Sequence, residues 1–212
     1  MSTGLPYPEV GLQALRRKPS FAALERASVR LVRTVDELLQ AFAIRSAVFM
    51  AEQVCPYHEE FDGNDLAGCH LVASVENEPV ATLRLRWFAS FGKVERVCIL
   101  PAARGKHLER VLLAHAFELA SRKGFRLMTG QIQARLWPMW QKTIHCTLRD
   151  NRPSFAFSDF EYLEIDIPIP SHPKSISPLS DPYLLIRPEG SWDATGILEE
   201  SVERSEERRA AA

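Results

Sequence analysis

The residues best suited to chemistry in this 212-residue chain lie in one run near its middle. Glu95 and Arg96 open an apolar stretch that ends at Pro101. The basic loop Arg104-Gly105-Lys106 follows, just before an apolar-periodic segment that begins at Leu108. The first N–H groups of a helix lack intrahelical partners and carry the positive end of its dipole. Together with the cationic side chains of Arg104 and Lys106, these N–H groups predict a binding site for the phosphate of a phosphorylated cofactor.

A series of strands and helices must position this loop. Alternating and β-branched apolar residues predict strands at residues 28–33, 69–76, 79–87, 94–100 and 126–133, with terminal strands between 153 and 169. Helical spacing of apolar residues predicts helices over about 35–49, 108–123 and 136–146. Thr34 stands where the N-cap of the first helix is expected, and Lys123-Gly124 closes the second.

Composition narrows the class of protein. A chain with 46% hydrophobic and 25% charged residues can bury one substantial core. The net charge of −1, with basic and acidic residues intermixed, disfavours nucleic-acid binding. The four cysteines show no CxxC spacing, which favours reduced thiols over a metal site. No run reaches membrane-spanning length and no signal core is seen, so we expect a cytoplasmic protein with no membrane span.

Three regions are expected along the chain. Residues 1–27 contain prolines and form an arm, 28–169 form the main domain, and 170–212 form a Pro-rich linker and an extension with a charged tail. We expect the tail beyond Glu199 to be frayed, because it has almost nothing to bury. The apolar segment Tyr183–Ile186 packs either on its own sheet or on a second subunit, so a homodimer stays open.

Several segments together resemble the GNAT N-acyltransferase superfamily. Its donor site has a strand of the type ERVxVxP followed by RGxGxG/A, matched here by residues 95–101 and 104–106. The stretches at 44–53, 60–65, 70–73 and 79–86 are similar to the ElaA-type, hemolysin-associated branch, and more distantly to autoinducer and N-acyl amino acid synthases. The resemblance covers roughly residues 29–166. It implies an α/β fold, a mixed and mostly antiparallel central sheet flanked by helices.

The resemblance also implies an acyl donor carried as a thioester, either acyl-CoA such as acetyl-CoA or an acyl-carrier protein, and no metal. Main-chain groups of the fourth strand and the following loop would bind it, with Trp140 beside them: Val97, Cys98, Ile99, Arg104, Gly105, Lys106, His107 and Leu108. The chain departs from the family pattern where His107 and Glu109 replace small residues. Trp140 stands where a tyrosine acid is usual.

An amine must lose a proton to attack a thioester, so a base is needed near the donor. Glu95 is the first choice, although a structural salt bridge with Arg84, Arg86 or Arg96 is an equally weighted alternative. His70 is a second base or a structural histidine, and His145 a substitute acid. The expected substrate-binding residues are Arg45, Glu60, Asp62, Arg84 and Arg96, and Arg45 is expected to pair with an acidic residue of the 60–65 loop.

The resulting hypothesis is an N-acyltransferase that moves an acyl group from acyl-CoA or acyl-carrier protein to the amine of a small molecule. The alternative is a GNAT-shaped protein that has lost catalysis and binds a ligand or a protein.

Overall fold

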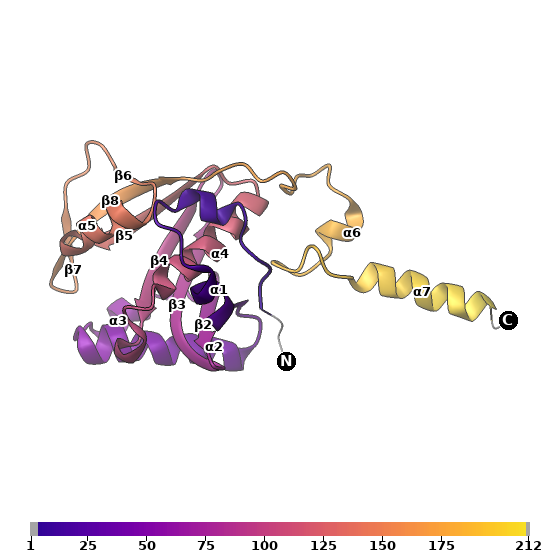
Figure 1. The fold of residues 1–212 in the computed structure, drawn as a ribbon, viewed down its shortest axis with the longest axis horizontal. Coiled ribbons are helices and arrows are strands. Elements are labelled where there is room, and N and C mark those ends of the chain that lie inside the picture. Colours follow the sequence, from indigo (N-terminus) through magenta and orange to yellow (C-terminus); the bar gives the residue numbers. More distant parts are fainter. Residues whose placement is uncertain (1–3, 211–212) are drawn as a thin grey trace.

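A central sheet of eight strands organises the structure, a computed structural model that describes residues 4–210. The strand order is β1-β2-β3-β4-β5-β8-β6, and β7 pairs with the end of β8 (Figure 1). The strands are β1 (Ala27–Leu31), β2 (Cys69–Val75), β3 (Glu78–Trp87), β4 (Gly92–Ile99), β5 (Leu127–Gln133), β6 (Thr147–Leu148), β7 (Phe155–Phe157) and β8 (Phe160–Pro168). Among these described strands only β4 and β5 pair in parallel, so the expected mixed, mostly antiparallel sheet is confirmed.

Helices cover both faces of this sheet. Helix α2 (Val35–Arg45) continues as a π-helix (Ser46–Glu52) and packs on one face, against Val72 and Cys98. Helix α4 (Leu108–Arg122) packs on the other face, against Leu71 and Leu83. The other helices of the body are short: α1 (Phe21–Arg26), α3 (Tyr57–Glu60), α5 (Trp137–Thr143) and the 3-10 helices at Pro101–Ala103 and Ala134–Leu136.

The start of α2 is fixed by its own sequence. The Thr34 hydroxyl accepts the N–H of Glu37, and the Glu37 carboxylate accepts the N–H of Thr34, which is a complete capping box. The helix that the sequence predicts after Thr34 is therefore confirmed. Helix α2 ends at Arg45, and the chain continues directly as the π-helix Ser46–Glu52.

The N-terminal segment packs on the outer side of α4 through a 3-10 helix η1 (Gly11–Ala14). A Cβ atom at Gly11 would lie only 1.9 Å from the carbonyl oxygen of Ala114, so only glycine allows this close approach. Leu12 and Leu15 are buried there, which makes the arm part of the core. Helix α4 is consequently buried along nearly its whole length.

Strands β4 and β5 separate after three residue pairs. They pair from Gly92 with Met128 to Val94 with Gly130, and no further. On its other edge β4 carries a bulge, because Arg84 pairs with Glu95 whereas Thr82 pairs with Cys98. Arg96, in the bulge, has a positive φ of 53°. The split between β4 and β5 and the bulge in β4 both lie at the centre of the sheet, beside Glu95 and Arg96.

The C-terminal extension differs from expectation. Residues 170–196 pack back on the body around helix α6 (Pro182–Leu185), and α7 (Ile197–Ala210) then projects away as a regular helix (Figure 1). The expected frayed tail is therefore wrong for these residues, although none of the α7 side chains is buried. Between residues 4 and 210, no helix combines the length and the apolar character needed to cross a membrane.

Candidate functional site

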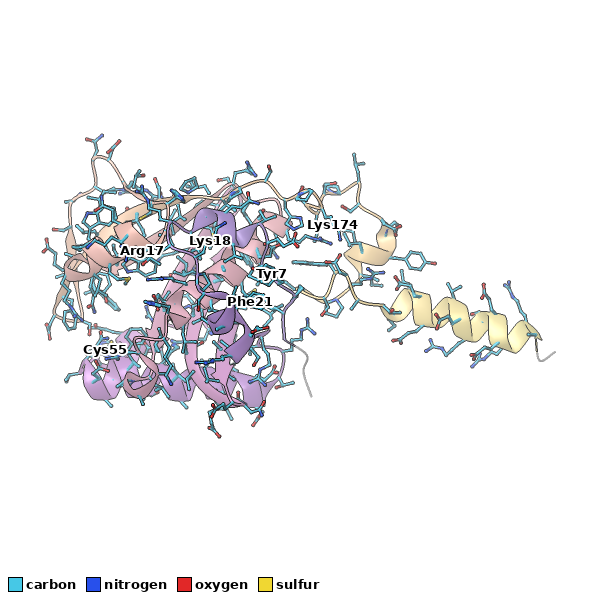
Figure 2. All side chains as sticks on the ribbon, in the orientation of Figure 1. Tyr7, Arg17, Lys18, Phe21, Cys55 and Lys174 are labelled. Carbon is cyan, nitrogen blue, oxygen red and sulfur yellow. The ribbon has the colours of Figure 1, made fainter. Side chains whose placement is uncertain are left out.

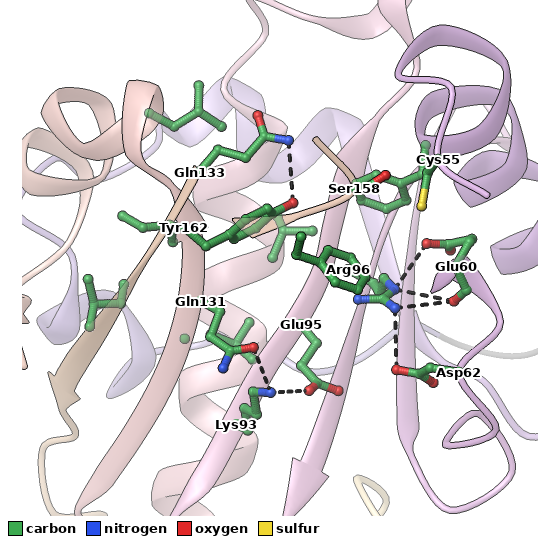
Figure 3. Close-up of a pocket in the computed structure, with 18 of the residues that line it drawn as sticks. Cys55, Glu60, Asp62, Lys93, Glu95, Arg96, Gln131, Gln133, Ser158 and Tyr162 are labelled. Carbon is green, nitrogen blue, oxygen red and sulfur yellow. Dashed lines mark hydrogen bonds and ion pairs between the residues drawn. The ribbon is translucent and has the colours of Figure 1, made fainter. Parts of the chain in front are cut away.

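The candidate site is a cavity of about 260 Å³ at the split between β4 and β5. Residues Glu95–Val97 form one wall and Gly130–Gln133 the other, and Trp140 of α5 is among the further lining residues. Tyr162 of β8 also lines the cavity (Figure 3). Beyond Val94, the edge of β4 that faces β5 has no strand partner in the described part of the chain. An extended ligand can therefore hydrogen bond along this open main chain.

Glu95 is both a wall of the cavity and a member of an ion network. Its carboxylate lies 2.8 Å from Arg84 and 2.7 Å from Lys93, with Arg86 at 3.7 Å. Burial alone would raise the pKa of Glu95, but Lys93 and Arg84 hold that pKa below its usual value. The salt-bridge alternative is thus observed, and the charged carboxylate still faces the cavity.

Behind this wall lie two fully buried arginines. Arg45 contacts Glu60 and Asp65 at 2.5 Å each, so its expected pairing with the acidic loop is confirmed. Arg84 contacts Asp62 at 2.7 Å and Asp65 at 2.8 Å, in addition to Glu95. Neither arginine lines the cavity. In this structure both side chains hold the acidic loop in place, and their predicted contact with substrate stays a prediction.

Arg96, Glu60 and Asp62 do reach the cavity. The bulge turns the Arg96 guanidinium toward the acidic loop, 3.0 Å from Glu60 and 3.3 Å from Asp62 (Figure 3). Burial raises the pKa of Glu60 despite Arg45 and Arg96. For Asp62, hydrogen bonds from Arg84 and the N–H of Asn64 outweigh burial and lower the pKa. The loop is therefore tied by both ion pairs and an Asx-type turn.

Tyr162 is one of the polar lining residues that sequence reasoning missed. Gln133 donates from Nε2 to Gln53 at 2.9 Å and to the Tyr162 hydroxyl oxygen at 3.4 Å, while its Oε1 accepts from Arg135. Since the amide of Gln133 is fixed on both sides, the Tyr162 oxygen accepts and its own hydrogen stays available. No local pattern marks this tyrosine, because only the sheet order places β8 beside the split.

The predicted phosphate loop forms as a tight turn before α4. Gly105 has a φ of 79° and His107, the N-cap of α4, a φ of 59°. Lys106 is exposed, whereas Arg104 pairs with Glu52 at 2.5 Å and donates to the carbonyl of Ile99 at 3.1 Å. His107 lies 3.4 Å from Glu109, so these two side chains turn toward each other over the first helical turn.

The two predicted histidines lie away from the cavity. His70 is buried, with Nε2 3.0 Å from the carbonyl of Asp65, and burial lowers its pKa. His145 is exposed, and its main-chain N–H donates to Ala14 of the N-terminal segment. The structure therefore does not bring either one to Glu95. Within residues 4–210 no group of His, Cys, Asp and Glu side chains is arranged to hold a metal ion, and the four cysteines are free.

A mixed sheet that splits beside a helix-capping loop is the arrangement that the sequence resemblance implies, and the comparisons agree. Residues 34–143 match the acetyltransferase (GNAT) family. A Bacillus subtilis protein named "putative acetyltransferase" is 37% identical over 112 residues, covering 50% of this chain and 76% of that protein. The chain belongs to the GNAT acetyltransferase family.

Solved structures show the same fold. Escherichia coli ElaA superposes with a TM-score of 0.59 at 21% identity, covering 66% of this chain and 99% of ElaA. BjaI, a CoA-dependent acyl-homoserine lactone synthase, gives a TM-score of 0.56 at 13% identity, covering 68% of this chain and 84% of that one. The predicted likeness to ElaA, and to an autoinducer synthase, is therefore confirmed at the level of the fold.

Proposed function

We propose that this protein is an N-acyltransferase that moves an acyl group from a thioester donor to the amine of a small molecule. The observation that carries the proposal is the open edge of β4 beside a cavity that holds both Glu95 and Tyr162. Family membership supports acyl transfer as the reaction class. The identity of the residues that act in it rests on the geometry alone.

The donor in this proposal is acyl-CoA, with an acyl-carrier protein as the alternative. The pantetheine arm lies along the main chain of Val97–Ile99, and its phosphate end meets the turn at Gly105–Leu108. Lys106 is exposed there, and the first N–H groups of α4 lack intrahelical partners. The CoA dependence of BjaI, which shares the fold, favours CoA over the carrier protein.

Glu95 receives the acceptor amine. Its lowered pKa keeps Glu95 ionised at neutral pH, so the carboxylate attracts and orients the ammonium group, which loses its proton through water to the solvent. Glu60 and Asp62 add acceptors on the same side. Once neutral, the amine attacks the thioester carbonyl, a new C–N bond forms, and the C–S bond breaks as the thiolate leaves.

Tyr162 protonates that leaving thiolate. Its oxygen accepts from Gln133, which leaves the hydroxyl hydrogen free to be donated to sulfur. In this role it replaces the tyrosine whose usual position is taken by Trp140, because an indole has no proton to give at accessible pH.

The test is thiol release. The purified protein is incubated with acetyl-CoA, longer acyl-CoAs or acyl-carrier protein, together with a panel of small amines, and free thiol is followed with a thiol-reactive chromophore. Amine-dependent release above the hydrolysis rate is expected with at least one donor. No release with any donor, from protein whose circular dichroism shows it to be folded, would contradict the proposal.

A second candidate function has its own supporting observation. Arg104, one of the two cations expected to grip phosphate, is already paired with Glu52. A protein whose donor loop is closed in this way would bind a ligand without turnover. Glu52→Gln separates the two candidates: release of Arg104 strengthens acyl-CoA binding in either case, but only an enzyme shows amine-dependent thiol release. A ligand that raises the unfolding temperature without any turnover would favour the binding function.

A further inference from the structure

A second and larger cavity lies on the far side of α4, outside the site described above. Its volume is about 500 Å³. Residues 4–10 of the N-terminal segment form one wall, the outer face of α4 a second, and residues 172–174 and 190–194 of the extension a third. Figure 2 labels Tyr7 and Lys174 at this junction. Two of the three walls therefore come from segments outside the family match at 34–143.

Four residues of α4 face this cavity at helical spacing: His115, Glu118, Leu119 and Arg122. Three acidic side chains line the cavity, Glu9, Glu118 and Asp193, and the last two are already engaged. Glu118 accepts from the N–H of Gly11 at 2.6 Å and from Nε2 of His172 at 3.0 Å. Asp193 pairs with Arg122 at 3.0 Å and with Lys174 at 3.4 Å. These contacts hold the three walls together.

Two buried side chains, His115 and Arg122, have hydrogen-bonding atoms without a partner in residues 4–210. His115 is 6% exposed, and its Nδ1 lies 2.8 Å from the carbonyl of Val111. Nδ1 is thus the protonated nitrogen, and Nε2, which has no partner in residues 4–210, is an acceptor. Arg122 is 5% exposed, and in the same residues only its Nη2 is hydrogen bonded, while Nε is buried without a partner.

The distance between His115 and Arg122 determines how long a ligand must be to contact both side chains. His115 and Arg122 are two helical turns apart, which is about 10 Å along the axis. Between them the wall is apolar, with Leu119 from the helix, Val10 from the N-terminal segment and Trp192 from the extension. A ligand group that donates a hydrogen bond suits the His115 end. At the Arg122 end, Asp193 already pairs with Nη2 of Arg122 and with Lys174, so an added anion would bind through the N–H groups that these two cations still have free.

We infer that this cavity binds an elongated organic acid: a carboxylate held by Arg122 and Lys174, an apolar or aromatic body against Leu119 and Trp192, and a hydroxyl or N–H that donates to His115. The site does not depend on the acyltransferase proposal, because none of these residues lines the cavity between β4 and β5.

The test uses three probes of comparable length and the full-length protein, with binding measured by calorimetry. Para-hydroxyphenylpropionate carries both the donor and the carboxylate, phenylpropionate lacks the donor, and para-hydroxyphenylpropanol lacks the carboxylate. The wild-type protein is expected to bind the hydroxy acid about 3- to 10-fold more tightly than phenylpropionate, and the alcohol at least about 10-fold more weakly than the acid. This comparison needs no variant.

Variants then assign the contacts. His115→Leu should abolish the preference for the hydroxyl, and Arg122→Met should weaken both acids by about 10-fold or more while leaving the alcohol unchanged. Matched controls away from the cavity, His58→Leu and Arg126→Met, should behave as wild type. Equal binding of the three probes, no measurable binding, or unchanged binding by both variants would overturn the inference. Loss of binding in Glu95→Gln would place the probe in the other cavity and overturn it as well.

Discussion

At the scale of single residues, the candidate site places the carboxylate of Glu95 and the hydroxyl of Tyr162 in the same cavity. Glu95 comes from β4 and Tyr162 from β8, strands that are separated by β5 in the sheet. They can share a cavity only because β4 and β5 stop pairing after Val94 and Gly130. The split thus gives Glu95 and Tyr162 access to the same ligand.

Tyr162→Phe tests the second of these groups. The substitution removes only the hydroxyl and keeps the ring packing, so we expect kcat to fall by about 100-fold or more while KM changes little. Steady-state thiol release measures both constants. Tyr57→Phe, at an exposed tyrosine outside the cavity, is the matched control and should retain wild-type kcat. An unchanged kcat with a raised KM would show that the hydroxyl only contacts substrate.

The sequence predicted Glu95 but could not predict Tyr162, and the difference has a physical reason. Glu95 sits in a local run of residues whose types and spacing indicate its surroundings. The surroundings of Tyr162 depend on pairing of β8 with β5, a long-range contact that no local period encodes. The same reason explains Arg45 and Arg84, whose charge suggested a ligand contact although folding buries them against Asp65.

At the scale of elements, prediction was good wherever a start or stop signal was local. Thr34 begins α2 as expected, and Gly124, with a φ of 88°, ends α4. The strands predicted at 69–76 and 79–87 leave residues 77 and 78 between them, but the turn residues are Glu76 and Asn77, both with positive φ. The two-residue strand β6 was missed because it is too short to show a period.

Thr34→Ala measures how much the capping box contributes to stability. Loss of the hydroxyl leaves the N–H of Glu37 without its partner, so the free energy of unfolding should fall by about 1 kcal/mol, within a range of about 0.5–2 kcal/mol. Urea denaturation gives the value. Ser154→Ala, an exposed position outside any helix or strand, should change it by less than about 0.5 kcal/mol. Equal effects of the two substitutions would show that the box does not stabilise α2.

At the scale of the whole molecule, the core lies entirely within the body, and α7 adds nothing to it. All α7 residues have side chains that are exposed or only partly covered. A helix can form here without burial because Glu and Arg, which dominate this segment, have high intrinsic helix propensity.

Removing residues 201–212 should therefore leave the body intact. Glu199 and its contact with Arg187 are kept, no buried side chain of α7 is lost, and the free energy of unfolding should change by less than about 0.5 kcal/mol. Urea denaturation and light scattering of the shortened and full-length chains provide the comparison. A larger loss of stability, or a fall in molar mass from dimer to monomer, would show that α7 contacts a second copy.

Helix α4 connects the proposed donor loop with the second cavity: its first turn follows the loop, and its later turns line that cavity. Thermodynamic linkage then sets a strict condition on any communication between them. If an occupant beside His115 alters the affinity of the loop for a thioester, the thioester must alter the affinity for that occupant by the same factor. A single titration, run in either order, reports that factor for both ligands.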